Sequence, residues 1–510
     1  MFAFRAVAQI DLLALFVDVC LVKLFHQGES SMMGTHQPQK DLFSYQVDLD
    51  RRIRSDHPLR RIADLVDFNF VREKVKDKYG YNGNVSVDPV IIIKLMFLLF
   101  FENVRSEREL MQTIPERLDW LWFLGYGLDD EVPDHSVLSK ARKRWGPEVF
   151  EAFFVRIVGQ CAQLGLVDGK KIHVDGSLVD ANASKGSVVK GPPELIAALK
   201  QAYGVEEQKL SDTRSPYYQP VNRRVMSKTD PDSAVVRQKR SYDSRPRYKH
   251  HRVVDDTYGV ITAVETTPGD VEENERLMEL VDQHEANTES RTETVVADRQ
   301  YGTNANFRKC HERGIRSHMG DFKSSLEGKG RSKGIFPESA FIYDPVTDRY
   351  RCPAGEELHR RKHKKARGLY EYAAARHICA ACALRAQCTR AKNGTPRTIV
   401  RHFGQEAINA ARVESHSEEA YKDRARRKWL IEGSFGDATT RHGFKRSRWR
   451  RLWRQQIQDY LIATIQNVRI ALRHAAPTPT GVISQGKNVI LALYDACTAS
   501  IRRYVMPIQA

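Results

Sequence analysis

The 510-residue sequence lacks any run of apolar residues long enough to cross a membrane. A membrane-spanning helix needs about 18 or more consecutive, mostly apolar residues. The first 25 residues are apolar, but four charged side chains interrupt them, and the two acidic ones also argue against a signal peptide. We therefore expect no membrane partner. Met32 and Met33 are the expected start of translation, which makes residues 1–32 a non-native or disordered extension.

Cysteine is also scarce, with 8 residues in the chain. Four of them stand alone, and nothing in their spacing indicates the disulfide framework of a small secreted domain. The expected compartment is the reducing cytoplasm, in association with the nucleoid. The sequence contains no internal repeat, and its 41% of hydrophobic residues is enough to build a sizeable core, which excludes a disordered chain.

Acidic residues are outnumbered, because 64 Asp and Glu face 81 Lys and Arg and leave a formal net charge of +17. A surplus this large favours a polyanionic partner, since Lys and Arg release the counterions that phosphates condense. Nucleic acid is therefore the expected partner. A soluble enzyme that is merely basic is the alternative.

Residues 33–165 predict an all-helical N-terminal domain that binds DNA. Pro58 suits the first turn of one helix with Asp56 as its cap, and Asp88 opens a second, almost wholly apolar helix. A third helix begins after Pro133 and carries four basic residues, which either contact DNA or form a solvated face. These residues are Lys140, Arg142, Lys143 and Arg144.

Residues 170–320 change to alternating strand and helix patterns. Strands are expected at 171–175, 251–256, 260–266 and 294–298, with a helix at 271–286. This order indicates a mixed α/β sheet. The long polar segment 180–248 is expected to be a functional or flexible loop.

Asp175 and Asp298 each end an expected strand. Functional groups gather at the carboxyl ends of strands in open sheets, so the two carboxylates are expected side by side. They would repel one another unless a cation lay between them, and Mg²⁺ or Mn²⁺ suits hard oxygen ligands. Two such ions would activate a nucleophile and stabilise the leaving oxygen at phosphorus. Aspartates that only form turns are the alternative.

Glu432 lies in residues 401–475, where the pattern returns to helix. Trp429 and Phe435 lie three residues on either side of it, so the spacing predicts that all three share one inward face. A carboxylate with apolar neighbours needs a positive partner. Glu432 is therefore either a third metal ligand or the partner of Lys428.

The intervening segment, 321–400, is rich in Lys, Arg and Cys and contains four clustered cysteines. They are Cys352, Cys379, Cys382 and Cys388. Four thiolates suit a tetrahedral Zn²⁺ site, although Cys352 has no close partner in sequence, and four reduced thiols without metal are the alternative. The zinc would hold together an insertion that otherwise lacks a core. The tail, 476–510, carries no prediction.

Several short motifs occur in a fixed order along the chain. They include Pro-Asp-His-Ser at 133–136, His-Val-Asp-Gly-Ser at 173–177, Val-Ala-Asp-Arg-Gln-Tyr-Gly at 296–302 and Glu-Gly-Ser-Phe-Gly-Asp-Ala at 432–438. As an ordered set they resemble the motifs of bacterial insertion-sequence DDE transposases. The resemblance covers roughly residues 33–475, and it points to the branch with an N-terminal helical transposase domain and a cysteine-containing insertion.

The resemblance implies an RNase H-like mixed sheet with flanking helices, preceded by the helical domain and interrupted by the Cys-rich insertion. It implies that Asp175, Asp298 and Glu432 form a triad that binds Mg²⁺ or Mn²⁺. The triad would hydrolyse DNA at the element's ends and join the freed 3′-hydroxyl to target DNA. The implied partners are double-stranded DNA, as terminal inverted repeats and target, and a second copy in a homodimer. Phosphates would be positioned by Arg441, Lys445, Arg446 and Arg448.

The helix that carries Glu432 departs from the family pattern of Tyr, Arg, Glu and Lys. Ala425, Lys428 and Thr439 stand at the places of the other three residues. The roles that the Tyr, Arg and Lys of the family pattern have therefore cannot be assigned to residues of this helix. A catalytically decayed transposase that only binds DNA is the first alternative, and a metal-dependent nuclease without strand transfer is the second.

Overall fold

The computed structural model describes residues 47–80, 85–204, 221–237, 243–321, 333–365 and 368–474. The expectation for residues 1–32 concerns residues outside these ranges, and so does the tail 476–510. No helix within the described ranges is both long enough and apolar enough to span a bilayer.

The first part of the described chain is helical. Its helices are α2 (Leu49–Arg52), α3 (Pro58–Leu65), α4 (Phe70–Val75), α5 (Pro89–Phe101), α6 (Glu107–Thr113), α7 (Leu118–Leu124), α8 (Ser136–Trp145) and α9 (Glu148–Gln163). Asp88 caps α5 as predicted, because its Oδ1 accepts the Val90 N–H at 2.9 Å. The prediction that Asp56 caps α3 is wrong. The cap is His57, whose Nδ1 accepts the Leu59 N–H at 3.3 Å.

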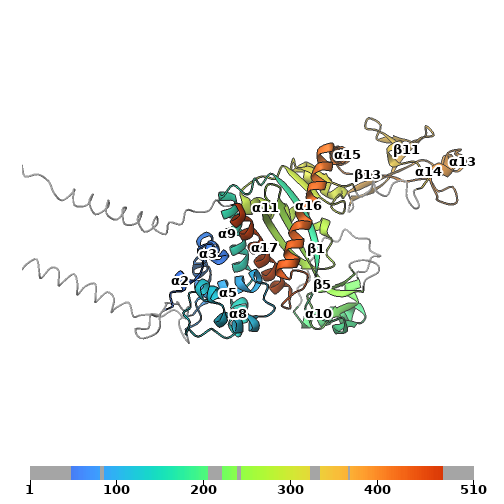
Figure 1. Ribbon diagram of the computed structural model, residues 1–510. Coiled ribbons are helices and arrows are strands. Elements are labelled where there is room, and N and C mark those ends of the chain that lie inside the picture. The colour runs from blue at the N-terminus through green and yellow to red at the C-terminus, as the bar shows by residue number, and fades with distance from the viewer. Residues whose placement is uncertain are drawn as a thin grey trace, which may run out of the picture.

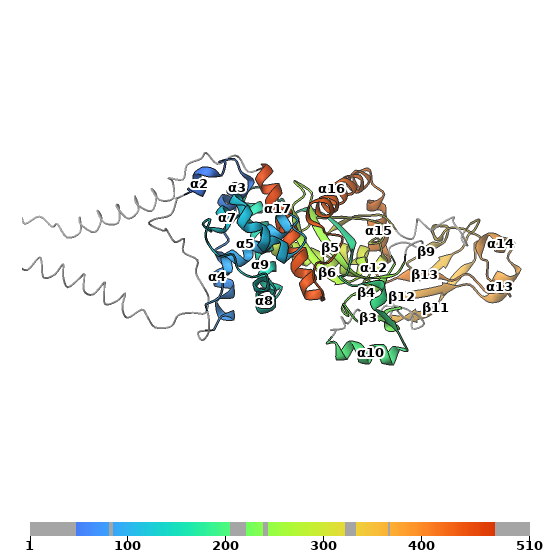
Figure 2. The same cartoon turned by 60° about the horizontal axis from the view of Figure 1, so that its bottom comes forward.

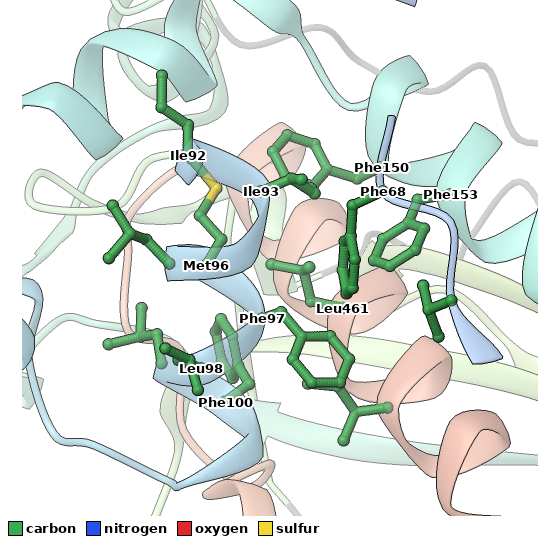
Figure 3. Packing of buried hydrophobic residues seen from close by; sticks show 14 of the residues in the cluster. Phe68, Ile92, Ile93, Met96, Phe97, Leu98, Phe100, Phe150, Phe153 and Leu461 are labelled. Atoms are coloured by element: carbon green, nitrogen blue, oxygen red, sulfur yellow. The ribbon is translucent and has the colours of Figure 1, made fainter. Parts of the chain in front are cut away.

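These helices share one hydrophobic core with α17 (Leu452–His474), the last described helix. Figure 3 shows Phe68, Phe97 and Phe153 gathered around α5 with Leu461 of α17 beside them. The Phe68 and Phe97 rings meet edge to face, with centroids 5.8 Å apart. The two ends of the described chain are therefore held together by burial of apolar side chains.

The central sheet has the order β4-β5-β1-β7-β8, and β6 pairs with the same edge of β5 as β4, further along that strand. Its strands are β1 (Lys171–Asp180), β4 (Ala234–Val236), β5 (Arg245–Asp255), β6 (Ile261–Pro268), β7 (Thr294–Ala297) and β8 (Arg316–Met319). β1 is antiparallel to β5 and parallel to β7, and β7 is parallel to β8. The mixed α/β sheet that the element order predicts is therefore present.

Helices cover both faces of this sheet (Figure 1). On one face, Ile172 and Val174 of β1 pack into a core with α11 (Leu277–Thr288), α12 (Asn304–Glu312) and α15 (Gln405–Ser415). On the other face, Val254 and Ile261 pack with α9, α16 (Glu418–His442) and α17. Because side chains alternate along a strand, Asp175 points toward α16 rather than toward α11.

Two boundaries differ from the sequence prediction. Asp175 does not end its strand, because β1 pairs with β5 as far as Asp180. The pairing of β1 with β7 does stop at Val174, however, so Asp175 still marks the end of the parallel pair. The helix expected from residue 271 begins at Leu277, after the 3-10 turn η5 (Glu273–Arg276).

The segment 180–248 is not one long loop, because its described parts hold regular elements. They are β2 (Val188–Lys190), α10 (Pro193–Ala202), β3 (Val225–Ser227) and β4. β2 and β3 pair as a two-stranded sheet. The backbone groups of this polar segment are thus satisfied by strand pairing, which composition alone does not reveal.

The Cys-rich insertion forms a second antiparallel sheet, of order β13-β12-β11-β10-β9, which projects away from the central sheet (Figures 1 and 2). Its elements are β9 (Ile342–Asp344), β10 (Arg349–Arg351), β11 (Glu357–Lys364), β12 (Leu369–Ala373), α13 (Arg376–Ala381), α14 (Arg385–Cys388) and β13 (Ile399–His402). Phe341, Leu358, Tyr372 and Ile399 are buried together in it. The expectation of a coreless insertion is therefore wrong.

Candidate active site

Two acidic residues meet where β1 and β7 stop pairing. Val174 of β1 lies opposite Ala297 of β7, so the next residue of each strand, Asp175 and Asp298, leaves the pair at the same level. Asp175 is held by Arg427 of α16, whose Nη1 lies 2.8 Å from Oδ2, while Oδ1 accepts the Gly176 N–H at 2.9 Å. Asp298 Oδ1 accepts the Gln300 N–H at 2.8 Å.

The groups around Asp175 change the pKa of its carboxyl. Burial raises the pKa of the Asp175 carboxyl, while the Arg427 guanidinium and the Gly176 N–H oppose that rise. The negative charge of Asp298 raises the pKa of Asp175 further. A cation would be stabilised beside a buried carboxylate that has a second acid as its neighbour.

Glu432 does not join these two acids. Its side chain is exposed, and it lines an open surface pocket with Tyr258 and Lys428. The predicted inward face is wrong, because Trp429 is 73% exposed. The buried side of α16 instead carries Asp423, Ile431 and Ala438.

The helical repeat explains this separation. Arg427, which contacts Asp175, lies five positions before Glu432, and that spacing turns the two side chains about 140° apart around the helix axis. The described ion pairs include none between Glu432 and Lys428, the partner that the spacing offered as an alternative. The structure therefore brings together Asp175 and Asp298 and leaves Glu432 on the outer surface of α16.

Two residues that were not predicted lie at the site. Glu273, in η5, occupies the space where a side chain at position 176 would lie, on the α11 side of β1, and burial raises the pKa of its carboxyl, with the charges of Asp175 and Asp298 adding to the rise. Tyr301, three residues after Asp298, is completely buried. Each had a weak sequence signal, since Glu273 follows an expected strand and Tyr301 belongs to the 296–302 motif.

A separate acidic group lies near the start of β1. Single ligand atoms of His318, Glu419 and Asp423 lie within 4.8 Å of one another. Lys171 Nζ is 2.9 Å from Asp423, and Arg316 Nη2 is 2.6 Å from Glu419, so protein cations already neutralise the group. Lys171 is four residues before Asp175, roughly 13 Å along the strand, which makes this a distinct ion-pair network.

The basic residues predicted to bind DNA divide into two sets. Lys140, Lys143 and Arg144 are exposed on α8, which suits both a DNA-contacting face and a solvated one. Arg142 is only 2% exposed, because it pairs with Glu107 and lies over the Trp449 ring at 3.9 Å from its centroid. Its assignment to that face is therefore wrong.

The second predicted basic cluster lies on and after the end of α16. The backbone there pairs with the end of β1, since the Asp180 N–H donates to the Lys445 carbonyl at 2.9 Å. Lys445 is exposed, and its Nζ donates to Ser177 Oγ at 2.5 Å, two residues beyond Asp175. Arg441 and Arg446 are also exposed. Arg448 is instead turned inward, where its Nη1 donates to the Leu99 carbonyl at 3.2 Å.

The four clustered cysteines converge on one small pocket of the insertion sheet. All four are free thiols. Burial raises the pKa of Cys379, and the other three cysteines lie close enough to raise it further. No three of the four sulfurs lie within 4.8 Å of one another in the described chain, so they are more widely spaced than in a closed zinc site.

Comparison with known proteins identifies two domains. A transposase domain (DUF772) matches residues 47–144, and a transposase DDE domain matches residues 351–471, a range that holds Glu432 but neither Asp175 nor Asp298. No curated protein matches the chain. Among solved structures, a cryo-EM structure of the piggyBac transposase synaptic complex with hairpin DNA is similar over 82% of this chain and 74% of that chain, at 10% identity and a TM-score of 0.32.

The likeness to the solved structure carries no argument at that TM-score. The two domain matches do, because they are independent and occur in the order that the motifs predict. They confirm the resemblance on which the sequence interpretation rests. Both matched domains are transposase domains, which agrees with the resemblance to insertion-sequence DDE transposases that carry an N-terminal transposase domain.

Proposed function

We propose that this protein cleaves and joins DNA at a divalent-metal site built around Asp175 and Asp298. The observation that carries the proposal is the meeting of these two carboxylates where the parallel strands β1 and β7 stop pairing. The strand order β6-β5-β1-β7-β8, with its antiparallel and parallel halves, also supports the RNase H-like fold that the resemblance implies.

Mg²⁺ or Mn²⁺ fits these donors, because carboxylates are hard oxygen ligands and an adjacent pair needs positive charge. Such ions, when bound, activate the attacking oxygen and stabilise the leaving oxygen of a phosphodiester. Arg427 and the Gly176 N–H each use one lone pair of Asp175 and fix its orientation, and further lone pairs stay free for a cation. Lys445 and Arg446, exposed beside the end of β1, would position the DNA phosphates.

Glu432 stays a prediction as the third member of the triad. Its support is the motif at 432–438 and its place inside the segment that matches the DDE domain. Against it, α16 would have to turn by about 140° around its axis before Glu432 reached the place of Arg427. The outward position of Glu432 favours the second candidate function, a DNA-binding protein that no longer cuts.

The partners that we propose are the terminal inverted repeats of the element and a target duplex, bound by a homodimer. We also propose a structural Zn²⁺ on Cys352, Cys379, Cys382 and Cys388. Four thiols that line one pocket match zinc in number and kind.

Incubation with DNA that ends in the flanking element's inverted repeats tests the proposal. With Mg²⁺, the wild-type protein should produce nicks at the ends and joined products. Asp175→Asn and Asp298→Asn should lower the cleavage rate by at least about 10³-fold, because each removes a charged ligand of the reacting centre. Asp282→Asn, on the outer side of α11 and 63% exposed, is the matched control and should cleave normally.

The outcomes separate the candidates. DNA binding by the wild type with no nicks in Mg²⁺ or Mn²⁺ would establish the non-cutting alternative. Nicks without joined products would indicate a nuclease that lacks strand transfer. Full activity in Asp175→Asn would exclude the proposed site.

A further inference from the structure

The Cys-rich insertion carries over half of the net positive charge of the chain. Residues 321–400 hold 17 Lys and Arg against 8 Asp and Glu, whereas the rest of the chain holds 64 against 56. The charge is concentrated further within one strand and the turn after it, because positions 359–365 read His-Arg-Arg-Lys-His-Lys-Lys without an acidic residue. A block of like charges this long usually repels itself into disorder, but here most of it is built into β11.

The structure places this run at an exposed edge of the insertion sheet, which projects from the central sheet (Figure 2). β10 pairs with β11 only at Glu357 and Leu358, so beyond Leu358 β12 is the one described strand that pairs with β11. Residues 359–363 are all exposed, whereas a strand with one buried face alternates between buried and exposed positions. A free edge also presents backbone N–H groups that no neighbouring strand bonds.

Basic side chains lie on both faces of this edge. In the register with β12, Arg360 lies opposite Tyr372. Lys362 lies opposite Glu371, after a bulge at the residue between. Because neighbouring residues of β12 point to opposite faces of the sheet, Arg360 and Lys362 do so as well. A polyanion that meets the edge would therefore find cations on both sides of the strand.

Acidic residues do not neutralise this edge. The ion pairs that reach it join Arg360 to Asp348 and Lys364 to Glu371. Neither Lys362 nor Lys365 takes part in an ion pair or a side-chain hydrogen bond within the described chain. The folded insertion thus holds a surplus of positive charge that a bound polyanion would offset.

We propose that the edge of β11, from residue 359 to residue 365, is a docking surface for duplex DNA, where its basic side chains bind the phosphates. Lys and Arg bind phosphates without reading sequence, so the surface should hold any duplex. Lysine on an exposed edge also keeps the sheets of different molecules apart, but that role does not account for seven consecutive basic residues. The inference rests on DNA as the partner in the proposed function and does not depend on the metal site.

Binding of the full chain to a labelled duplex of unrelated sequence, measured against salt concentration, tests the inference. The double variant Lys362→Gln, Lys365→Gln removes two charges that have no partner in the described chain. At about 0.1 M salt its affinity should be at least about tenfold weaker, and the slope of log affinity against log salt should fall by about 2. The control is Lys170→Gln, Lys309→Gln, which removes two exposed charges beside β1 and on α12 and should bind like the wild type.

The affinities separate this inference from the proposed function. A wild-type protein that binds no duplex would contradict DNA as the partner, and both proposals would then be wrong. If the wild type binds and the two double variants bind equally well, only the docking surface on β11 is wrong.

Chemical modification of lysines in the wild-type protein measures the contact without a substitution. Duplex DNA should slow acetylation of Lys362 and Lys365 by an amine-reactive reagent and leave that of Lys170 and Lys309 unchanged. An edge that instead meets an acidic protein surface would leave Lys362 equally reactive with and without the duplex, which would overturn the inference. Without DNA, the Lys362→Gln, Lys365→Gln variant should melt at or above the wild-type temperature, because two mutually repelling charges are gone.

Discussion

At the scale of single residues, the bonding of buried hydroxyls differs sharply between two tyrosines. Tyr301 has an unpartnered hydroxyl, whereas the Tyr248 hydroxyl donates to Asp230 Oδ1 at 2.6 Å. We expect Tyr301→Phe to leave the free energy of unfolding in EDTA unchanged or to raise it by about 1 kcal/mol, because it removes an unsatisfied polar group. Tyr248→Phe should lower it by about 1–3 kcal/mol, because the buried Asp230 carboxylate loses one of the two donors to its Oδ1. Urea unfolding of both variants measures these free energies, and an equal loss of unfolding free energy in the two variants would contradict the expected difference.

His442, at the end of α16, makes stability depend on pH. Its Nδ1 lies 2.8 Å from the Phe100 carbonyl, and burial lowers the pKa of its imidazole to about 4. The unfolded chain therefore takes up this proton first, near pH 6.5. The contribution of neutral His442 to the free energy of unfolding is fully present above that pH and is lost as the pH falls toward 4. Between pH 7 and 5 the urea midpoint should fall more for the wild type than for His442→Gln, and identical falls would refute this assignment.

At the scale of elements, α17 packs a polar face into the molecule. Asn467 forms two bonds with Ile261 of β6, because its Nδ2 donates to the carbonyl at 2.7 Å and its Oδ1 accepts the N–H at 2.8 Å. Asn467→Ala would leave both backbone groups buried without partners and should cost about 3 kcal/mol of unfolding free energy. Arg473→Ala, exposed on the same helix, should change it by less than about 0.5 kcal/mol. Similar urea midpoints for the two variants would argue against this role of Asn467.

The insertion sheet offers a test of the zinc proposal. The wild-type protein should carry one zinc per chain by elemental analysis, and the double variant Cys379→Ser, Cys382→Ser should carry none. Because the sheet has its own apolar core, removal of zinc should loosen the loops around α13 and α14 without unfolding the strands. Hydrogen exchange with and without chelator would measure this, and a metal-free wild type would end the proposal.

At the scale of the whole molecule, positive charge should govern DNA affinity. Replacing Lys140, Lys143 and Arg144 with alanine should weaken binding to every duplex. It should also reduce the slope of log affinity against log salt by about 1 for each phosphate that the protein no longer neutralises. Arg142→Ala should instead destabilise the fold, because Arg142 is buried between Glu107 and Trp449. If Arg142→Ala changed the salt dependence of DNA affinity and left the stability of the fold unchanged, the assignment of Arg142 to the buried core would be contradicted.

Short sequence patterns were sufficient to predict the features that depend only on residues close together in the chain. Asp88 before Pro89 predicts the start of α5, and the alternation around Val174 predicts which face of β1 is buried. The meeting of Asp175 with Asp298 also follows from local patterns, since each comes at the end of a parallel pairing. The extent of β1 did not follow, because it depends on pairing with β5, more than 60 residues away.

Orientation around a helix depended on contacts that are distant in sequence. The spacing of Trp429, Glu432 and Phe435 predicted an inward stripe, but α16 turns Arg427 and Ile431 inward instead. Aromatic residues at helical spacing indicate a shared face and do not say which way that face points. Arg142 was misassigned for a similar reason, because only packing against Trp449 shows that its charge is buried.

The sequence by itself predicted the two transposase domains, the mixed α/β sheet and the strand ends at Asp175 and Asp298, because ordered motifs and strand periodicity are contained in short stretches of chain. Only the tertiary structure decided which other groups face them. Arg427 of α16 pairs with Asp175, although the two residues are 252 positions apart in the chain. Glu432 is kept from Asp175 by the packing of α16 on β1. Contacts of that kind depend on the free energy of packing the whole chain, which no short stretch specifies.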